Sequence, residues 1–301
     1  MDVNLLAKFD LSAYLLSQRT VIERALEHAI EPRYPEKIYK SMRYSLLSGG
    51  KRLRPALCLA SCALGGGDPD VAIPTACGLE MLHTASLIHD DLPSMDNDDY
   101  RRGKLSNHKM FGEGMALLTG DALWSYALEF ILLNTRSVSS DRMLRVLHTL
   151  INRVGVAGLV GGQVVDIESE GLENIDLATV EYIHSHKTAS MIDAAVVTGA
   201  VLAGADEEAI CRLSRYAGRI GLAFQIVDDV LDTTGTRQQL GKTPNKDNKI
   251  RKATFPRLFG VDESMRRAYD LVNSAKHELA PFGEGATPLL AIADYIYERT
   301  T

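Results

Sequence analysis

Helical periodicity runs along almost the whole chain and constrains its fold more than any other feature. Apolar residues recur three and four positions apart, which is the spacing that lines one face of an α-helix. No segment alternates apolar and polar residues as a strand does, and no Asn-Gly or Asp-Gly hairpin turn is present. The sequence therefore predicts an all-α protein with a single domain over residues 1–301. Helices are expected over 11–30, 35–48, 54–64, 70–91, 113–134, 139–168, 176–203, 206–234, 262–280 and 286–299.

The composition excludes several classes of protein. Hydrophobic residues make up 46% of the 301 residues, enough for a sizeable core, and the net charge is −6. A general nucleic-acid binder would be basic, so we expect no nucleic-acid partner. The four cysteines lack the two-residue spacing of zinc and redox sites, which suits a reducing compartment. The N-terminus lacks the basic start of a signal peptide, and no apolar run reaches about 18 residues, so we expect a cytoplasmic protein without a membrane span.

An acidic segment follows the predicted helix 70–91. It carries five aspartates within ten residues and is followed at once by Arg101 and Arg102. Crowded carboxylates repel one another unless a cation lies among them, and oxygen ligands of this kind suit magnesium together with substrate phosphates. Pro93 should end the helix and let the chain turn back. A solvated acidic loop is the alternative. The aspartates are Asp90, Asp91, Asp96, Asp98 and Asp99.

A second acidic group lies within the strongly apolar predicted helix 206–234. Gln225, Asp228 and Asp232 are spaced by three and four residues, so they share one face of that helix. Carboxylates among apolar side chains are costly to bury unpaired, so a metal ion or a lysine must compensate them. This group makes a metal site in the acidic loop the stronger interpretation.

Three basic stretches complete the pattern. Residues 49–55 read Gly-Gly-Lys-Arg-Leu-Arg-Pro and precede a helix N-terminus, which favours an anion such as a diphosphate. Lys187 and Thr188 stand at the start of an apolar helical segment, and a lysine-rich loop spans 241–252. His83 lies two helical turns before Asp90 on the same face. Considered alone, each stretch could be a solvated surface, and His83 could be a core histidine.

Taken together, these groups predict a pocket for diphosphates bridged by magnesium. The metal ions would act as Lewis acids on the oxygens of a leaving group. The apolar helices beneath would hold a hydrocarbon and keep water from a carbocation. This combination favours ionisation of an allylic diphosphate over hydrolysis.

The sequence resembles the trans-prenyl diphosphate synthases, most closely the bacterial and plastid farnesyl and geranylgeranyl diphosphate synthases of carotenoid pathways. The resemblance runs from about Tyr34 to Arg299. The gap of four residues between Asp91 and Asp96 matches the bacterial and plastid types. The resemblance rests on the motifs Gly-Gly-Lys-Arg-Leu-Arg-Pro (49–55), His-Asp-Asp-Leu-Pro-Ser-Met-Asp (89–96), Arg-Arg-Gly (101–103), Lys-Thr (187–188), Phe-Gln-Ile-Val-Asp-Asp-Val-Leu-Asp (224–232) and Gly-Lys-Thr (241–243).

The resemblance implies a helical bundle around a central cavity, a homodimer and three Mg²⁺ ions. It implies that Asp90, Asp91 and Asp96 hold two ions, and that Asp228 holds the third with outer support from Asp232. The implied ligands of isopentenyl diphosphate are Lys51, Arg54, His83 and Arg102. Those of the allylic diphosphate are Arg101, Lys187, Lys242 and Lys252. The implied catalytic residues are Lys187, Thr188 and Gln225, of which the last two turn oxygen dipoles toward the allylic cation.

The length of the product depends on the floor of the tail cavity. Ala85 and Ser86 lie five and four positions before Asp90, and both are small. An aromatic residue there would stop the chain near fifteen carbons. We therefore predict condensation of isopentenyl diphosphate with dimethylallyl, geranyl and farnesyl diphosphates to geranylgeranyl diphosphate.

Four alternatives stay open at this point. A farnesyl diphosphate synthase would share the chemistry and stop at fifteen carbons. A terpene cyclase would have no task for Lys51, Arg54 and His83. A phosphohydrolase would not need isopentenyl diphosphate, and a non-catalytic regulatory subunit would not need both acidic motifs.

Overall fold

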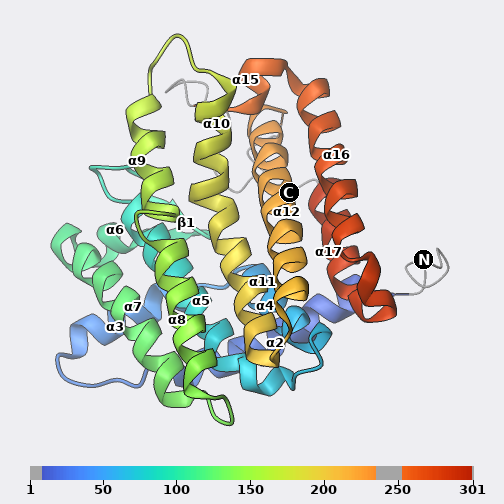
Figure 1. Cartoon of the computed structure of the whole chain (residues 1–301). Helices are drawn as coiled ribbons and strands as arrows, with labels where there is room; N and C mark the ends of the chain where they lie inside the picture. The colour runs from blue at the N-terminus through green and yellow to red at the C-terminus, as the bar shows by residue number, and fades with distance from the viewer. Residues whose placement is uncertain (1–8, 235–252, 300–301) are drawn as a thin grey trace.

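The computed structural model describes residues 9–234 and 253–299, and this part of the chain is almost entirely helical (Figure 1). The all-α prediction is confirmed. The α-helices are α2 (Leu11–Ala29), α3 (Glu36–Leu46), α4 (Leu53–Leu64), α5 (Pro69–Asp90), α6 (Asn107–Phe111), α7 (Glu113–Asn134), α8 (Ser140–Val154), α9 (Leu159–Ser169), α10 (Leu177–Ile183), α11 (Ser190–Ala203), α12 (Glu207–Thr234), α15 (Phe255–Phe259), α16 (Val261–Glu278) and α17 (Thr287–Glu298).

Two departures from the predicted helices have local causes. The helix expected over 139–168 is interrupted between α8 and α9. A Cβ atom at Gly158 would lie 2.1 Å from the carbonyl oxygen of Arg153, so this bend requires glycine. The helix expected over 176–203 contains a π-helical turn, His184–Ala189, between α10 and α11. Such turns frequently mark functional sites.

A short hairpin interrupts the helical pattern after α5. Strands β1 (Tyr100–Arg101) and β2 (Lys104–Leu105) pair antiparallel, with Arg101 opposite Lys104. The turn between them is Arg102-Gly103, with φ angles of 53° and 76°. Two consecutive residues with positive φ form the tight turns that join antiparallel strands. The sequence reading missed this hairpin because arginine rarely takes such a conformation.

Helix α11 lies at the centre of the bundle. It packs against α4, α5, α8 and α12, and all of its residues except Ala203 are buried. In Figure 1, α11 and α12 stand side by side at the front, with α8 and α9 on one flank and α16 and α17 on the other. This burial fits the apolar composition of the stretch from Ala194 to Leu202.

Within the described part of the chain, three helical stretches are long and apolar enough to cross a membrane by length and composition. They are α5, α7 and the segment Ser140–Ser169 that contains α8 and α9. The expectation of no membrane span considered only uninterrupted apolar runs. These three stretches are apolar on average over a window of 18 residues, although each contains some polar residues. Helix α5 lies mostly inside the protein, but α7 exposes several leucines, namely Leu117, Leu118, Leu132 and Leu133.

Candidate active site

The end of α5 carries the acidic segment, and the chain turns back there as the sequence predicts. Asp90 is the last residue of α5, and Pro93 lies in the turn that follows. The backbone N–H of Asp96 donates to the carbonyl oxygen of Asp90 at 2.8 Å. The turn thus brings Asp96 beside Asp90, although five residues lie between them in sequence.

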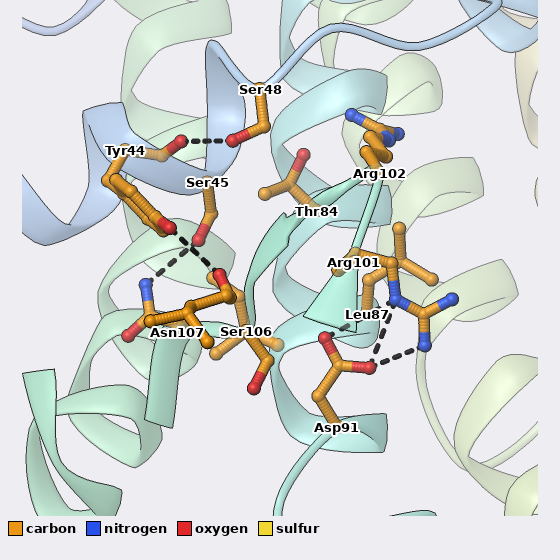
Figure 2. Close-up of a pocket in the computed structure, with 12 residues that line it drawn as sticks. Tyr44, Ser45, Ser48, Thr84, Leu87, Asp91, Arg101, Arg102, Ser106 and Asn107 are labelled. Atoms are coloured by element: carbon orange, nitrogen blue, oxygen red, sulfur yellow. Dashed lines mark hydrogen bonds and ion pairs between the residues drawn. The ribbon is translucent and has the colours of Figure 1, made fainter. Parts of the chain in front are cut away.

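Asp91 is buried and faces Arg101 (Figure 2). Its Oδ1 atom accepts a hydrogen bond of 3.0 Å from Nε of Arg101 and a second bond from Nη2. Burial raises the pKa of Asp91, while the hydrogen bonds from Arg101 oppose that shift. The resemblance implies that Asp91 is a metal ligand. In the structure its carboxylate is bound to Arg101, and its role toward a metal stays a prediction.

Arg101 and Arg102 bind different partners, and Figure 2 shows Arg101 turned to Asp91 while Arg102 points away from it. Arg101 is the last residue of β1 and reaches Asp91. Arg102 instead donates to the carbonyl oxygen of Gly49, and its Nη2 atom lies 3.4 Å from Oε1 of Glu80. Arg101 ends strand β1, whereas Arg102 has a left-handed conformation in the turn, with a φ of 53°. The two adjacent arginines therefore bind different partners, although both line the same pocket.

A basic cluster surrounds Arg102. Arg54 and Arg102 lie close enough to His83 to lower its pKa well below the ordinary value, although burial is the larger cause. His83 is therefore neutral at neutral pH. The Nε atom of Arg54 is buried and has no hydrogen-bond partner within the described residues. A buried donor of this kind can be satisfied by an anionic ligand. Lys51 is exposed beside this cluster.

The π-helical turn places Lys187 and Thr188. A Cβ atom at Gly162 would lie 2.3 Å from the backbone nitrogen of Lys187, so α9 approaches the turn as closely as glycine allows. The Nζ atom of Lys187 donates to Oδ2 of Asp166 at 2.6 Å, and Asp166 is buried. The sequence reading missed Asp166, although a lone carboxylate in the apolar run 159–167 is a usable signal.

A chain of hydrogen bonds joins this turn to α12. The hydroxyl of Thr188 donates to Oε1 of Gln225 at 2.7 Å, and Nε2 of Gln225 donates to Oδ1 of Asp229 at 2.9 Å. The other carboxylate oxygen of Asp229 lies 3.3 Å from Nε2 of His184. Burial lowers the pKa of His184 to about 4, so this histidine is neutral at neutral pH. Asp229 and His184 were not among the residues selected from sequence.

Asp228 lies at the more open side of α12, where its side chain is 45% exposed. Its Oδ1 atom accepts a hydrogen bond of 3.3 Å from Nη2 of Arg299, whose guanidinium stacks 3.8 Å from the ring of Phe224. Asp232, one turn further along α12, is buried. Arg299 was seen in the sequence only as the end of the resemblance, because no periodicity connects it to Asp228.

The carboxylates fit magnesium better than a softer metal. Within residues 9–234 and 253–299, no three histidine, cysteine, aspartate or glutamate side chains form a metal site on their own. Mg²⁺ usually binds through one or two carboxylates and takes its other ligands from water and substrate phosphates. Asp90, Asp96 and Asp228 are oxygen donors that suit such a shared site.

Two further pairs of residues were selected from the sequence. Ala85 and Ser86 are buried on α5, and the hydroxyl of Ser86 donates to the carbonyl oxygen of His83 at 2.8 Å. Lys242 and Lys252 lie outside the described residues.

Comparison with known proteins decides the family. The polyprenyl synthetase family matches residues 35–280 of the chain. The chain belongs to this family. It is therefore a prenyltransferase, and the resemblance seen in the motifs is confirmed.

Individual relatives match nearly the full length. A dimethylallyltranstransferase of Fischerella ambigua (strain UTEX 1903) is 61% identical over 294 residues, covering 98% of this chain and 85% of its own. A geranylgeranyl diphosphate synthase of Cyanophora paradoxa is 52% identical and covers 97% of both chains. Among solved structures, a geranylgeranyl pyrophosphate synthetase of Pyrococcus horikoshii superposes with a TM-score of 0.86 at 29% identity, covering 96% of this chain and 99% of its own.

Proposed function

We propose that this prenyltransferase condenses isopentenyl diphosphate with dimethylallyl, geranyl and farnesyl diphosphates, and that its main product is all-trans geranylgeranyl diphosphate. The observation that carries the proposal is the divergence of Arg101 and Arg102. Arg101 binds Asp91 in the acidic segment, and Arg102 lies with Arg54 close to His83, on which Arg101 also acts. Two arginines on one hairpin that bind different partners suit a reaction with two diphosphate substrates.

The allylic diphosphate would lie among the aspartates. We assign Asp90, Asp96 and Asp228 as the residues that hold Mg²⁺, which when bound would act as a Lewis acid on the departing oxygens. Arg101 and Lys187 would bind the diphosphate oxygens directly. We assign Asp91 and Asp166 to a different task, because each accepts a hydrogen bond from one of these cations.

Thr188 and Gln225 would face the allylic cation once the diphosphate has left. Gln225 donates its amide hydrogen to Asp229, so its amide orientation is fixed with Oε1 on the side of Thr188. Oriented oxygen dipoles stabilise a developing positive charge without reorganising. The isopentenyl double bond then attacks the cation, and the released diphosphate takes the proton, so no side-chain base is assigned.

The product length is inferred from the two small buried residues on α5. Ala85 and Ser86 are small and buried, and a larger side chain at either position would end a tail cavity that runs along α5 below Asp90. A fifteen-carbon product is the second candidate, because a deeper residue such as Leu82 is also buried on this helix.

We also propose a homodimer in the cytoplasm. The leucines that α7 exposes are Leu117, Leu118, Leu132 and Leu133, with 49–60% of each residue accessible. Exposed apolar groups gathered on one helix mark interaction surfaces. The four cysteines, which are all free thiols, suit a reducing compartment.

The two-substrate requirement tests the proposed reaction. Purified protein is incubated with Mg²⁺ and farnesyl diphosphate, with and without labelled isopentenyl diphosphate. We expect diphosphate release and label incorporation only when both substrates are present. Release from farnesyl diphosphate alone, with a cyclic hydrocarbon as product, would indicate a terpene cyclase.

A further inference from the structure

Glu80 is a buried carboxylate that none of the assigned roles uses. It lies on α5, ten residues before Asp90, and its side chain is 2% exposed. Its Oε1 atom lies 2.5 Å from Nη1 of Arg52 and 3.4 Å from Nη2 of Arg102. One carboxylate oxygen therefore accepts from two guanidinium groups that belong to separate segments of the chain.

We propose that Glu80 is a positioning residue for isopentenyl diphosphate. It joins residues 49–54 to the hairpin at Arg102, and it thereby sets the spacing of the cations that receive the diphosphate. This inference rests on the proposed assignment of Arg54 and Arg102 to the isopentenyl diphosphate site.

The backbone supports this role. Arg52 and Arg102 both have left-handed conformations, with φ angles of 52° and 53°. Residues other than glycine hold such conformations only when their surroundings fix them. Arg52 is further held by the carbonyl oxygen of Leu46 at 2.9 Å, and Arg102 by that of Gly49. Both arginines thus reach Glu80 from constrained positions.

The packing prevents Arg102 from moving closer to the loop of residues 49–52. A Cβ atom at Gly50 would lie 2.8 Å from Cζ of Arg102, so the guanidinium lies directly against this backbone. The loop of residues 49–52 and the hairpin are therefore in contact, with Glu80 beneath both.

The charges show why a carboxylate is needed at this place. Arg52 is 3% exposed, and its other acidic neighbour, Glu23, is 3.8 Å away and partly exposed. Arg54 and Arg102 are also close enough to interact with Glu80 electrostatically. A buried cation without its partner is strongly unfavourable. Glu80 compensates Arg52 and still leaves a positively charged surface for a diphosphate.

Replacement of Glu80 by glutamine separates positioning from a simple charge effect. Removal of a negative charge alone would strengthen anion binding and lower KM for isopentenyl diphosphate. If Glu80 positions the two segments, the same change raises that KM, because glutamine cannot hold two cations as a carboxylate does. The two effects therefore have opposite signs.

The experiment measures KM for each substrate and kcat in Glu80→Gln, with Glu23→Gln as the matched control. We expect KM for isopentenyl diphosphate to rise by about tenfold or more in Glu80→Gln, as is usual when a supporting partner is lost. KM for the allylic diphosphate should change less than about twofold, and Glu80→Asp should be intermediate. Glu23→Gln should match the wild type. An unchanged or lowered KM for isopentenyl diphosphate would overturn the proposal.

Two further variants keep the test decisive. If Glu80→Gln does not fold, the paired variant Glu80→Leu/Arg52→Met removes both charges, and it should fold but still show the raised KM. Arg54→Ala is measured in parallel to test the site itself. If Arg54→Ala leaves KM for isopentenyl diphosphate unchanged, the assigned site is wrong. If Arg54→Ala raises it and the Glu80 variants do not, only the role of Glu80 is wrong.

Discussion

Gln225 donates a hydrogen bond of 2.9 Å from its amide nitrogen to the carboxylate of Asp229, one helical turn away on α12. This bond fixes which end of the amide is nitrogen and which is oxygen. Because Oε1 then accepts from Thr188, the oxygen atoms of both side chains lie together at the π-helical turn. If Gln225 faces the allylic cation as proposed, Asp229 acts on the reacting centre through Gln225.

Replacement of Asp229 by leucine should lower kcat by about ten- to a hundredfold, as is usual when a group that orients a catalytic residue is lost. KM for both substrates should change little. Asp229→Asn keeps an oxygen acceptor for Gln225, so it should retain much more activity. The measurement is steady-state kinetics over a range of Mg²⁺ concentrations. An Asp229→Asn enzyme that recovers only at high Mg²⁺ would show that Asp229 is a metal ligand instead.

Asp90 and Asp91 are neighbours with different predicted roles. Asp90→Asn should reduce turnover by about a thousandfold, because several kcal/mol of charge stabilisation at the leaving group are lost. Asp91→Asn should chiefly raise KM for the allylic diphosphate, because Arg101 loses its buried partner. If both variants lose kcat equally and added Mg²⁺ restores it in each, Asp91 is a metal ligand like Asp90.

Ala85→Tyr should shorten the product. Ala85 is fully buried on α5. If the tail cavity runs below Asp90 as proposed, a large ring at this position would block it. The fifteen-carbon share of the products should rise strongly, as measured by chromatography after removal of the diphosphate. Ala85→Ser is the control and should keep the wild-type distribution. Unchanged products from the Ala85→Tyr enzyme would mean that the floor of the cavity lies elsewhere.

Negative charges introduced on α7 should weaken the proposed homodimer. Leu118 and Leu133 are 57% and 60% exposed. If this face is covered by a second copy, Leu118→Glu with Leu133→Glu buries two unpaired carboxylates and should shift the protein toward monomer in sedimentation experiments. Leu16→Glu, at an exposed leucine on α2, is the control. A dimer that persists unchanged would exclude this face.

The pH dependence of stability should reflect Glu278. Hydrogen bonds from Arg215, together with those from Arg219, lower its pKa from 4.5 to about 2 and join α16 to α12. A carboxylate with a lowered pKa stabilises the folded state above its unfolded pKa, and this stability is lost as the pH falls through the folded pKa. The free energy of unfolding should therefore fall between about pH 4.5 and 2.

Glu278→Gln should remove this part of the pH dependence. Urea unfolding at pH 6 and pH 3 should show a smaller difference than in the wild type. Glu181→Gln, at an exposed position of α10, is the control and should retain the full difference. A wild-type slope in Glu278→Gln would contradict the account.

The sequence predicted most helices well, but it did not predict which side chains of different helices contact each other. Helix 113–134 was predicted with the bounds that α7 has, because its apolar pattern is long and uninterrupted. The break at Gly158 was missed, because the same periodicity continues on both sides of it. Helical spacing placed Gln225 and Asp228 on one face, and Pro93 predicted the turn to Asp96.

The pairings between elements could not be predicted in this way. Periodicity indicates which face of a helix is buried, but not which residue of another segment lies against it. Glu80 was therefore only one residue of the predicted helix 70–91, although two arginines converge on it in the structure. Asp91 was grouped with its acidic neighbours for the same reason, because its arginine lies beyond a hairpin that the sequence pattern did not reveal.

Chromatography of the products tests the central claim most directly. Purified protein is incubated with Mg²⁺ and isopentenyl diphosphate and, in separate reactions, with the allylic diphosphates of five, ten and fifteen carbons. The account predicts a dominant twenty-carbon diphosphate from all three. A stop at fifteen carbons would contradict the inferred cavity floor at Ala85 and Ser86. An absence of elongation would contradict the proposed condensation itself.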